Sequence, residues 1–301
     1  MRIATAQYQS NMNQSLQLNQ ERLSKLTQQM AEGKRILVPS DDPVDSVRLS
    51  RLQREEAAIT QYRENIDSIK IRLTRTEGYL GNMVNDIAAG RDLLVFALDG
   101  SNTPDDLKAL ISPLTSLRDS LLFTANTVDQ EGNYVFSGTK TSTPAMTLNP
   151  DNGLYEFTGN ENTQDVVVAS GGLTQVANHN MAGMEKLLNA INATIEELTT
   201  GDRNVNQTGT RAILRANLDG FDDALNDISG KIAVLGGTQN ILDTLDANHS
   251  NVSLSNRMAI TDIGQLDMGV AATELNGYST ALQATYKAYG RIGSLSLFSA
   301  L

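Results

Sequence analysis

Hydrophobic residues in the first third of the chain recur every seven positions, beginning after Pro43. The unbroken series is Leu52, Ile59, Ile66, Leu73, Leu80, Ile87 and Leu94. A seven-residue apolar repeat of this length predicts one long helix with a single apolar seam. Asp42 stands at the N-cap position, and Pro43 suits the first helical position. The pattern therefore predicts a helix over 44–99, longer than a single compact domain needs.

A second seven-residue series occupies the last third of the chain. Its members are Leu214, Phe221, Ile228, Leu235 and Leu242, and Leu218, Leu225 and Ile232 complete the seam. Residues 48–75 contain seven Lys or Arg, whereas residues 219–246 contain six acids against Lys231 alone. Opposite charge bias on two long seams selects partner and orientation. We therefore expect the two long helices to lie antiparallel.

Two shorter helical patterns and one irregular region lie between these seams. Thr103 caps a pattern whose apolar face continues to about Val128, and a further pattern runs from Met184 to Leu198. Between them the sequence is rich in Gly, Asn, Pro and Thr, and it contains short β-type runs. These runs are 134–136, 154–157 and 165–168, with a hairpin turn at 151–153.

The predicted fold class is mainly α. It is a long antiparallel helical bundle or coiled coil, formed by the N- and C-terminal segments, with a small β-rich insertion domain in the middle. The expected domains are terminal helices, a long-helix bundle domain and a β-rich outer insertion. Their boundaries are 1–40 with 262–301, 41–131 with 180–261, and 132–179.

Composition excludes several classes of function. The chain has 24 Lys plus Arg against 35 Asp plus Glu, a formal net charge of −11, which argues against nucleic-acid binding. It contains no cysteine, so disulfides, thiolate nucleophiles and Cys-ligated zinc are absent. No apolar run is long enough to span a membrane, and the amino terminus lacks the apolar core of a secretory signal. We expect a soluble protein without membrane association that, if it leaves the cytoplasm, does not use a cleaved signal peptide.

The remaining candidates for chemistry have simpler explanations. His179 and His249 are the two histidines, and neither has a partner at metal-ligand spacing. His249 follows the apolar series, as expected for a seam residue near a helix end. Asp41, Asp42 and Asp45 lack the Gly and final Glu of a calcium loop, and capping accounts for two of them. The run 138–141 departs from the spacing of a phosphate-binding loop and is interpreted as a turn. We therefore expect no catalytic residue, no metal site and no cofactor.

Four stretches resemble the flagellin family of bacteria. They are the opening MRIATAQYQS, the run LTQQMAEGKRILVPSDDPVDSVRL over 26–49, GNYVFSGTKT beginning at Gly132, and the closing RIGSLSLFSAL. They occur in the family's order, and the resemblance covers essentially the whole chain. The SDDP element is shared with filament flagellins in general, whereas YVFSGTKT resembles the subunits at the hook-filament junction.

The resemblance implies a structural subunit of the flagellum, located at the hook-filament junction. It implies terminal segments that are disordered in the free subunit and become helical on assembly. The implied partners are identical subunits, another hook-associated protein on the hook side, flagellin on the filament side, and an export chaperone at the C-terminal helix. The implied location is extracellular, reached through the flagellar type III apparatus.

Apolar stripes at both chain ends are the candidate assembly interface, because too little chain surrounds them to form a core. Its residues are Tyr8, Met12, Leu16, Leu23, Leu26, Met30, Leu275, Leu282, Tyr286, Tyr289, Leu295, Leu297 and Phe298. A filament flagellin is the second hypothesis, and a secreted coiled-coil enzyme or effector is a distant third.

Overall fold

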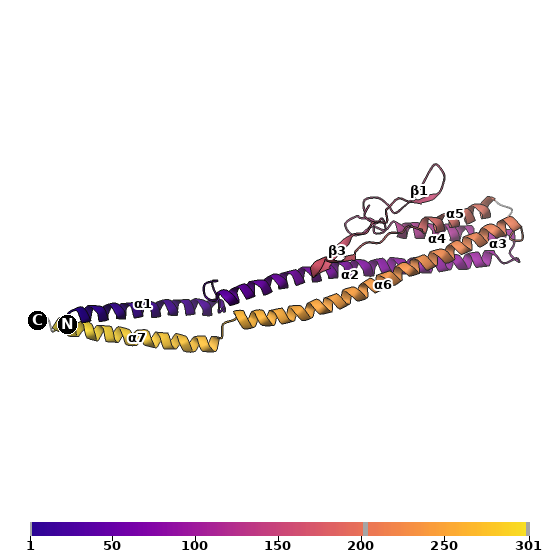
Figure 1. Ribbon diagram of the computed structural model, residues 1–301. Coiled ribbons are helices and arrows are strands. Elements are labelled where there is room, and N and C mark those ends of the chain that lie inside the picture. The colour runs from indigo at the N-terminus through magenta and orange to yellow at the C-terminus, as the bar shows by residue number, and fades with distance from the viewer. Residues whose placement is uncertain (1, 201–203, 299–301) are drawn as a thin grey trace. The chain divides into compact units, whose positions relative to one another are not determined.

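The chain divides into two compact units, in a computed structural model that describes residues 2–200 and 204–298 (Figure 1). One unit combines the chain up to Ile59 with the chain from Ser250 onward, and the other comprises Thr60–His249. Of residues 2–6 and 292–298 only the backbone is described.

The described elements are mostly helical, which confirms the predicted fold class. The helices are α1 Arg2–Glu32, α2 Pro43–Ala97, α3 Pro104–Ala109, α4 Ile111–Ala125, α5 Met184–Thr200, α6 Thr208–Gly264 and α7 Met268–Phe298. The strands are β1 Met146–Leu148, β2 Tyr155–Phe157, β3 Asp165–Ala169 and β4 Leu173–Val176, with a short 3-10 turn at Ser170–Gly172. The predicted long helices correspond to α2 and α6.

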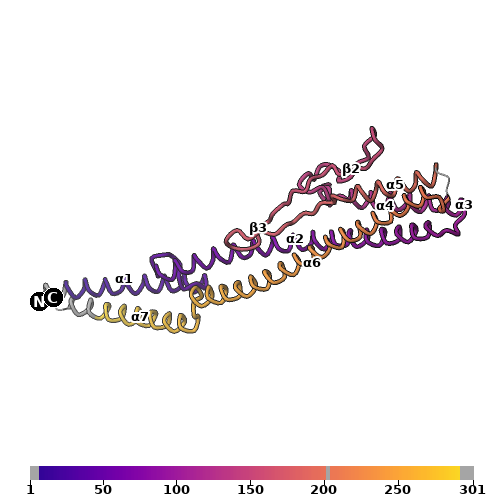
Figure 2. The backbone as a smooth tube through the Cα atoms, turned by 45° about the vertical axis from the view of Figure 1, so that its right-hand side comes forward, coloured from indigo at the N-terminus to yellow at the C-terminus, as the bar shows by residue number. Residues whose placement is uncertain are grey.

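Both predicted seams are buried within the unit Thr60–His249. On α2 the side chains at most 1% exposed include Ile66, Leu73, Leu80, Ile87 and Leu94. On α6 they are Leu214, Phe221, Ile228, Leu235 and Leu242. Helix α6 continues through Gly236 and Gly237 without a break. Helices α4 and α5 pack against each other and complete the bundle beside α2 and α6 (Figure 2).

Ion pairs join α2 to α6 in the expected antiparallel order. Arg63 Nε lies 2.8 Å from Asp246 Oδ1, and Lys70 Nζ lies 2.6 Å from Asp243 Oδ1. A third pair, Arg91 with Asp222, lies farther along α2 and nearer the start of α6. The paired side chains are substantially exposed, so each pair adds little stability. Their order instead fixes the direction and register of the two helices.

The helical pattern that follows Thr103 forms two helices, α3 and α4, where one was expected. The Thr103 cap is confirmed: its hydroxyl accepts a hydrogen bond from the Asp106 amide at 3.2 Å, and the Asp106 carboxylate accepts from the Thr103 amide at 2.9 Å. The break falls at Leu110. Pro113 explains it, because proline cannot donate to the carbonyl four residues earlier and its ring clashes there. The second helix ends at Ala125, earlier than the expected Val128.

The insertion contains two separate antiparallel hairpins, β1 with β2 and β3 with β4. The predicted runs 154–157 and 165–168 correspond to β2 and β3, and the turn at 151–153 joins β1 to β2. The expected strand at 134–136 is wrong. That segment forms turns with single bridges, and Phe136 is fully buried with its ring 6.2 Å from that of Tyr79. Its apolar pattern reflects anchoring in the helical core.

Gly138 is held in the left-handed region with φ of +67°. A Cβ atom at this position would lie 2.0 Å from the backbone oxygen of Asn160. We expect Gly138→Ala to destabilise the insertion by at least ~1–3 kcal/mol, through backbone strain and this clash. Gly132→Ala is the matched control, because Gly132 has φ of +82° and open space around its Cβ position. Hydrogen exchange within 132–179 should increase clearly more for Gly138→Ala; equal effects would contradict a role for the clash.

Candidate assembly surface

Helices α1 and α7 lie side by side and pack against each other in the unit formed by the two chain ends (Figure 2). A helix in a two-helix pair has one covered face, and the rest of its surface stays open. The pair therefore buries only a few apolar side chains completely. Leu26 is 5% exposed and Leu282 is 8% exposed.

The predicted interface residues fall into four groups. Leu26 and Leu282 are buried inside the pair. Five are half-buried: Met12, Leu16, Leu23, Met30 and Leu275. Three tyrosines are exposed, namely Tyr8 at 51%, Tyr286 at 56% and Tyr289 at 41%. The side chains of Leu295, Leu297 and Phe298 lie outside the described part of the chain.

Two backbone hydrogen bonds tie the α1–α2 turn to the end of α6. The Arg35 amide donates to the Gly264 oxygen at 2.8 Å, and the Leu266 amide donates to the Gly33 oxygen at 3.1 Å. Gly33 has φ of +69°, the left-handed conformation that suits glycine at the end of a helix. The two turns therefore form one small structure, which we call the junction hub (residues 33–45 with 263–267).

Arg35 is the cation at the centre of the junction hub. Its guanidinium donates to Asp42 Oδ2 at 3.2 Å, to the Asp45 carboxylate, and from Nε to the Ile263 oxygen at 3.0 Å. The hydrogen bond that Arg35 donates to Asp45 is the main cause that raises the pKa of Arg35, against a smaller desolvation effect. The Asp42 side chain also accepts from the Asp45 amide at 3.1 Å, which confirms it as the cap of α2.

Asp41 holds the loop before α2. Its Oδ2 accepts from the amides of Leu37 at 3.0 Å and Val38 at 3.2 Å, and its Oδ1 lies 2.6 Å from Lys25 Nζ. The Lys25 hydrogen bond contributes most to lowering the pKa of Asp41, followed by the two amides. The aspartates considered as a metal cluster are thus satisfied by Arg35, Lys25 and backbone amides. Arg35 was not among the residues expected from the sequence, although an arginine a few residues before three carboxylates was a usable signal.

The junction hub should be sensitive to acid. The folded-state pKa values of Asp41 and Asp42 are lowered, so their contribution is complete above the unfolded carboxyl pKa of about 3.9 and is lost as the pH falls through the lower folded values. We expect Asp41→Asn to lower the melting temperature at pH 7. The difference from the parent should shrink as the pH falls below about 4. Thermal unfolding across pH 3–7 measures this, and a difference independent of pH would contradict it.

The two histidines occupy structural positions. His249 Nε2 lies 2.8 Å from the Val168 oxygen, and its ring stacks on Tyr62 at 5.6 Å between centroids. The expected position of His249 near a helix end is wrong, because α6 continues to Gly264 and His249 lies within it. Burial is the main cause that lowers the pKa of His179, and nearby Lys231 lowers it further.

The described residues also bear on three other kinds of site: a metal cluster, a membrane span and a phosphate-binding loop. Among these residues, no three His, Asp or Glu side chains gather as metal ligands would. Within the same part of the chain, no helix combines the length and apolar character needed to cross a membrane. The segment 138–141 forms a turn with no helix after it, as expected.

Comparison with known proteins gives consistent matches. Residues 3–141 match the model of the bacterial flagellin N-terminal helical region. The chain is 29% identical to the flagellar hook-associated protein 3 of Escherichia coli K12 and 27% identical to that of Salmonella typhimurium, over 99% of each chain. A solved structure from Vibrio parahaemolyticus, assigned as a flagellar hook-associated protein, is 34% identical. It matches with a TM-score of 0.67 over 75% of this chain and 100% of that one.

Proposed function

Because this chain belongs to the flagellin family, among its flagellar hook-associated proteins, we propose that it is the structural subunit connecting the hook to the filament at the hook-filament junction. The full-length similarity to hook-associated protein 3 carries this proposal. The similarity includes both terminal helices and the insertion, so every part of the subunit has a counterpart. Curated flagellins match more weakly, at 22% identity over 90% of the chain.

The exposed apolar positions on α1 and α7 support assembly through the chain ends. Tyr8, Tyr286 and Tyr289 lie on helices that cover each other on one face only. Neighbouring subunits would supply the missing cover, and burial of this surface would drive polymerisation. In this proposal the terminal segments of a free subunit are disordered, and they form helices when neighbouring subunits pack against them.

The proposal also assigns partners to the subunit. Identical subunits surround it, another hook-associated protein lies on the hook side, and flagellin lies on the filament side. An export chaperone holds the C-terminal helix before export through the flagellar type III apparatus, without a cleaved signal peptide. The subunit is not an enzyme in this proposal, consistent with relatives that are structural proteins of the flagellum.

Immunogold labelling of isolated flagella tests the proposed location. We expect label confined to the hook-filament boundary, and cells lacking the protein should build hooks while releasing flagellin into the medium. Label along the whole filament would instead identify a filament flagellin. Normal filaments in the absence of the protein would exclude both structural roles.

A further inference from the structure

The first turns of α2 present an apolar and basic stripe away from α6. Val44, Val47, Arg48 and Arg51 are spaced as residues of one helical face, and Val44 is 78% and Val47 61% exposed. A different side of α2 faces α6, where Leu49 packs at Gly264 and Glu56 accepts a hydrogen bond from Ser253 at 2.6 Å. We call the outward set the valine stripe (Val44, Val47, Arg48 and Arg51).

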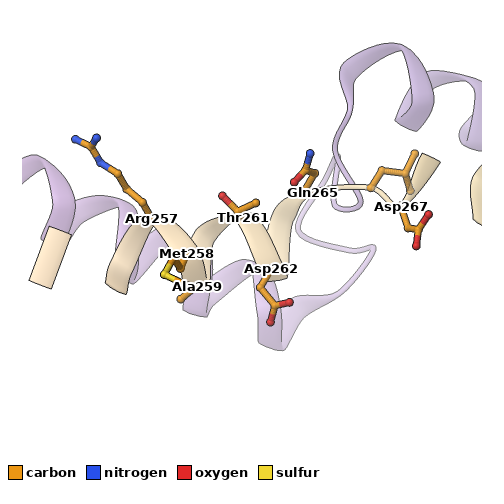
Figure 3. Close-up of a pocket in the computed structure, with 8 residues that line it drawn as sticks. Arg257, Met258, Ala259, Thr261, Asp262, Gln265 and Asp267 are labelled. Carbon is orange, nitrogen blue, oxygen red and sulfur yellow. The ribbon is translucent and has the colours of Figure 1, made fainter. Parts of the chain in front are cut away.

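The end of α6 presents a complementary hollow, part of which faces away from α2. A wide, open hollow of about 920 Å³ lies there, lined by residues of 257–267 (Figure 3). Met258 and Asp262 point to the same side of the helix in this view. Met258 is 65% exposed, and Leu254, one turn earlier on that face, is 60% exposed. We call this surface the corner hollow (Leu254 with Met258, Ala259, Asp262, Leu266 and Asp267).

The valine stripe and the corner hollow lie on different sides of the helix pair formed by α2 and α6. Buried Ser253, Asn256 and Ile263 mark the side of α6 that faces α2. At 100° per residue, Leu254, Met258 and Asp262 fall on the other side of α6. One subunit therefore carries both surfaces, and they point in different directions.

The two surfaces are complementary in chemistry as well as in position. The stripe combines exposed valines with two arginines. The hollow combines exposed apolar side chains with Asp262 and Asp267, and the cation in its lining, Arg257, is paired with Glu56. Among the described residues, no ion pair is formed by Arg48, Arg51 or Asp262, so these charges are available to a neighbour. With a net charge of −11, two copies repel each other overall, and local pairing of opposite charges is needed where they meet.

We propose that the valine stripe of one subunit docks in the corner hollow of a second copy of this chain. The contact is heterologous, because two different surfaces meet, and each subunit can therefore give one contact and receive another. Repetition of such a contact builds a ring or helical array. The inference rests on the proposed function, since it specifies one contact within the proposed assembly.

Cysteine cross-linking tests this contact in a chain that has no cysteine of its own. Flagella are isolated from cells whose only copy is the double variant Val47→Cys with Met258→Cys, and they are treated with an oxidant or a short bismaleimide. We expect covalent dimers and longer multimers on gels without reductant, because disulfide formation requires Cα atoms within about 7 Å. The two single variants should stay monomeric. So should Gln53→Cys with Met258→Cys, since Gln53 is exposed on α2 but lies off the stripe.

Three results would overturn the proposed contact. The first is a double variant that stays monomeric on gels although immunogold labelling of the hook-filament junction is normal. The second is dimer formation by the Val47→Cys single variant. The third is a cross-linked product that contains a different protein. Immunogold labelling of the same flagella reports on the junction role separately, so a failure of either idea is recognised by itself.

Charge reversal gives a second test that does not depend on cysteines. Arg48→Glu and Asp262→Lys should each lower the fraction of filament-bearing cells several-fold. Their combination in one chain should return it towards the parent value, because every contact then has a reversed pair. Lack of any rescue, with normal export of the three variants, would contradict the proposed contact.

Discussion

Replacing Tyr286 and Tyr289 by serine should give a subunit that folds and is exported but cannot hold a filament. The two rings are 56% and 41% exposed on α7, and neither belongs to the hydrophobic core of the unit Thr60–His249, so that core should still fold. A tyrosine buries 150–250 Å² when fully covered, and about half of this is available to a neighbour. At 25 cal/mol per Å², each ring would lose roughly 2–3 kcal/mol per subunit in the assembly. The expected phenotype is hooks without filaments and flagellin in the medium.

Lys287→Ser is the matched control for the tyrosine pair, because Lys287 lies between Tyr286 and Tyr289 in the sequence, is exposed, and falls on another face of the helix. It should leave filaments intact. Secretion of each variant must be measured too, since the proposed chaperone contact involves the same helix. Full-length filaments on cells that secrete only the double serine variant would show that this face of α7 is not an assembly surface.

The long helices could be predicted from sequence because their burial repeats. A seam residue every seven positions is a signal that does not depend on distant parts of the chain. The series through Ile66 and Leu73 on α2, and through Phe221 on α6, is buried as expected. The antiparallel order was also predictable, since opposite charge bias became pairs such as Arg63 with Asp246.

The features that sequence missed depend on contacts between distant segments or on a single residue. Phe136 was assigned to a strand because its local pattern is apolar, but a position in the helical core accounts for that pattern. The break at Leu110 results from Pro113, whose effect falls on residues before it in the chain. Arg35 binds Asp42 and Asp45 close by in the chain, but its third partner, the Ile263 oxygen, comes from the distant end of α6. Periodicity carries no information about any of these.

The sequence could predict which residues of the interface are apolar. It could not predict which of them face the partner helix and which face outward. Leu26 and Leu282 belong to the same stripes as Tyr286, yet they are buried between α1 and α7. The pairing of α1 with α7 determines which apolar residues stay exposed and can contact a neighbouring subunit. That pairing joins segments from opposite ends of the chain, and it places the tyrosines among the exposed positions.

Leu73→Ala should destabilise the unit Thr60–His249 by about 2–5 kcal/mol, because Leu73 is fully buried in the α2 seam and its truncation leaves a cavity. Ile71→Ala is the matched control: Ile71 is two residues away on the same helix and 63% exposed, so its loss should stay within about 0.5 kcal/mol. Urea unfolding of the full chain followed by circular dichroism measures both. The contrast also separates the two uses of apolar side chains in this protein, since Leu73 supports the fold of one subunit and Ile71 does not. Similar losses for both variants would mean that the seven-residue seam does not determine the core.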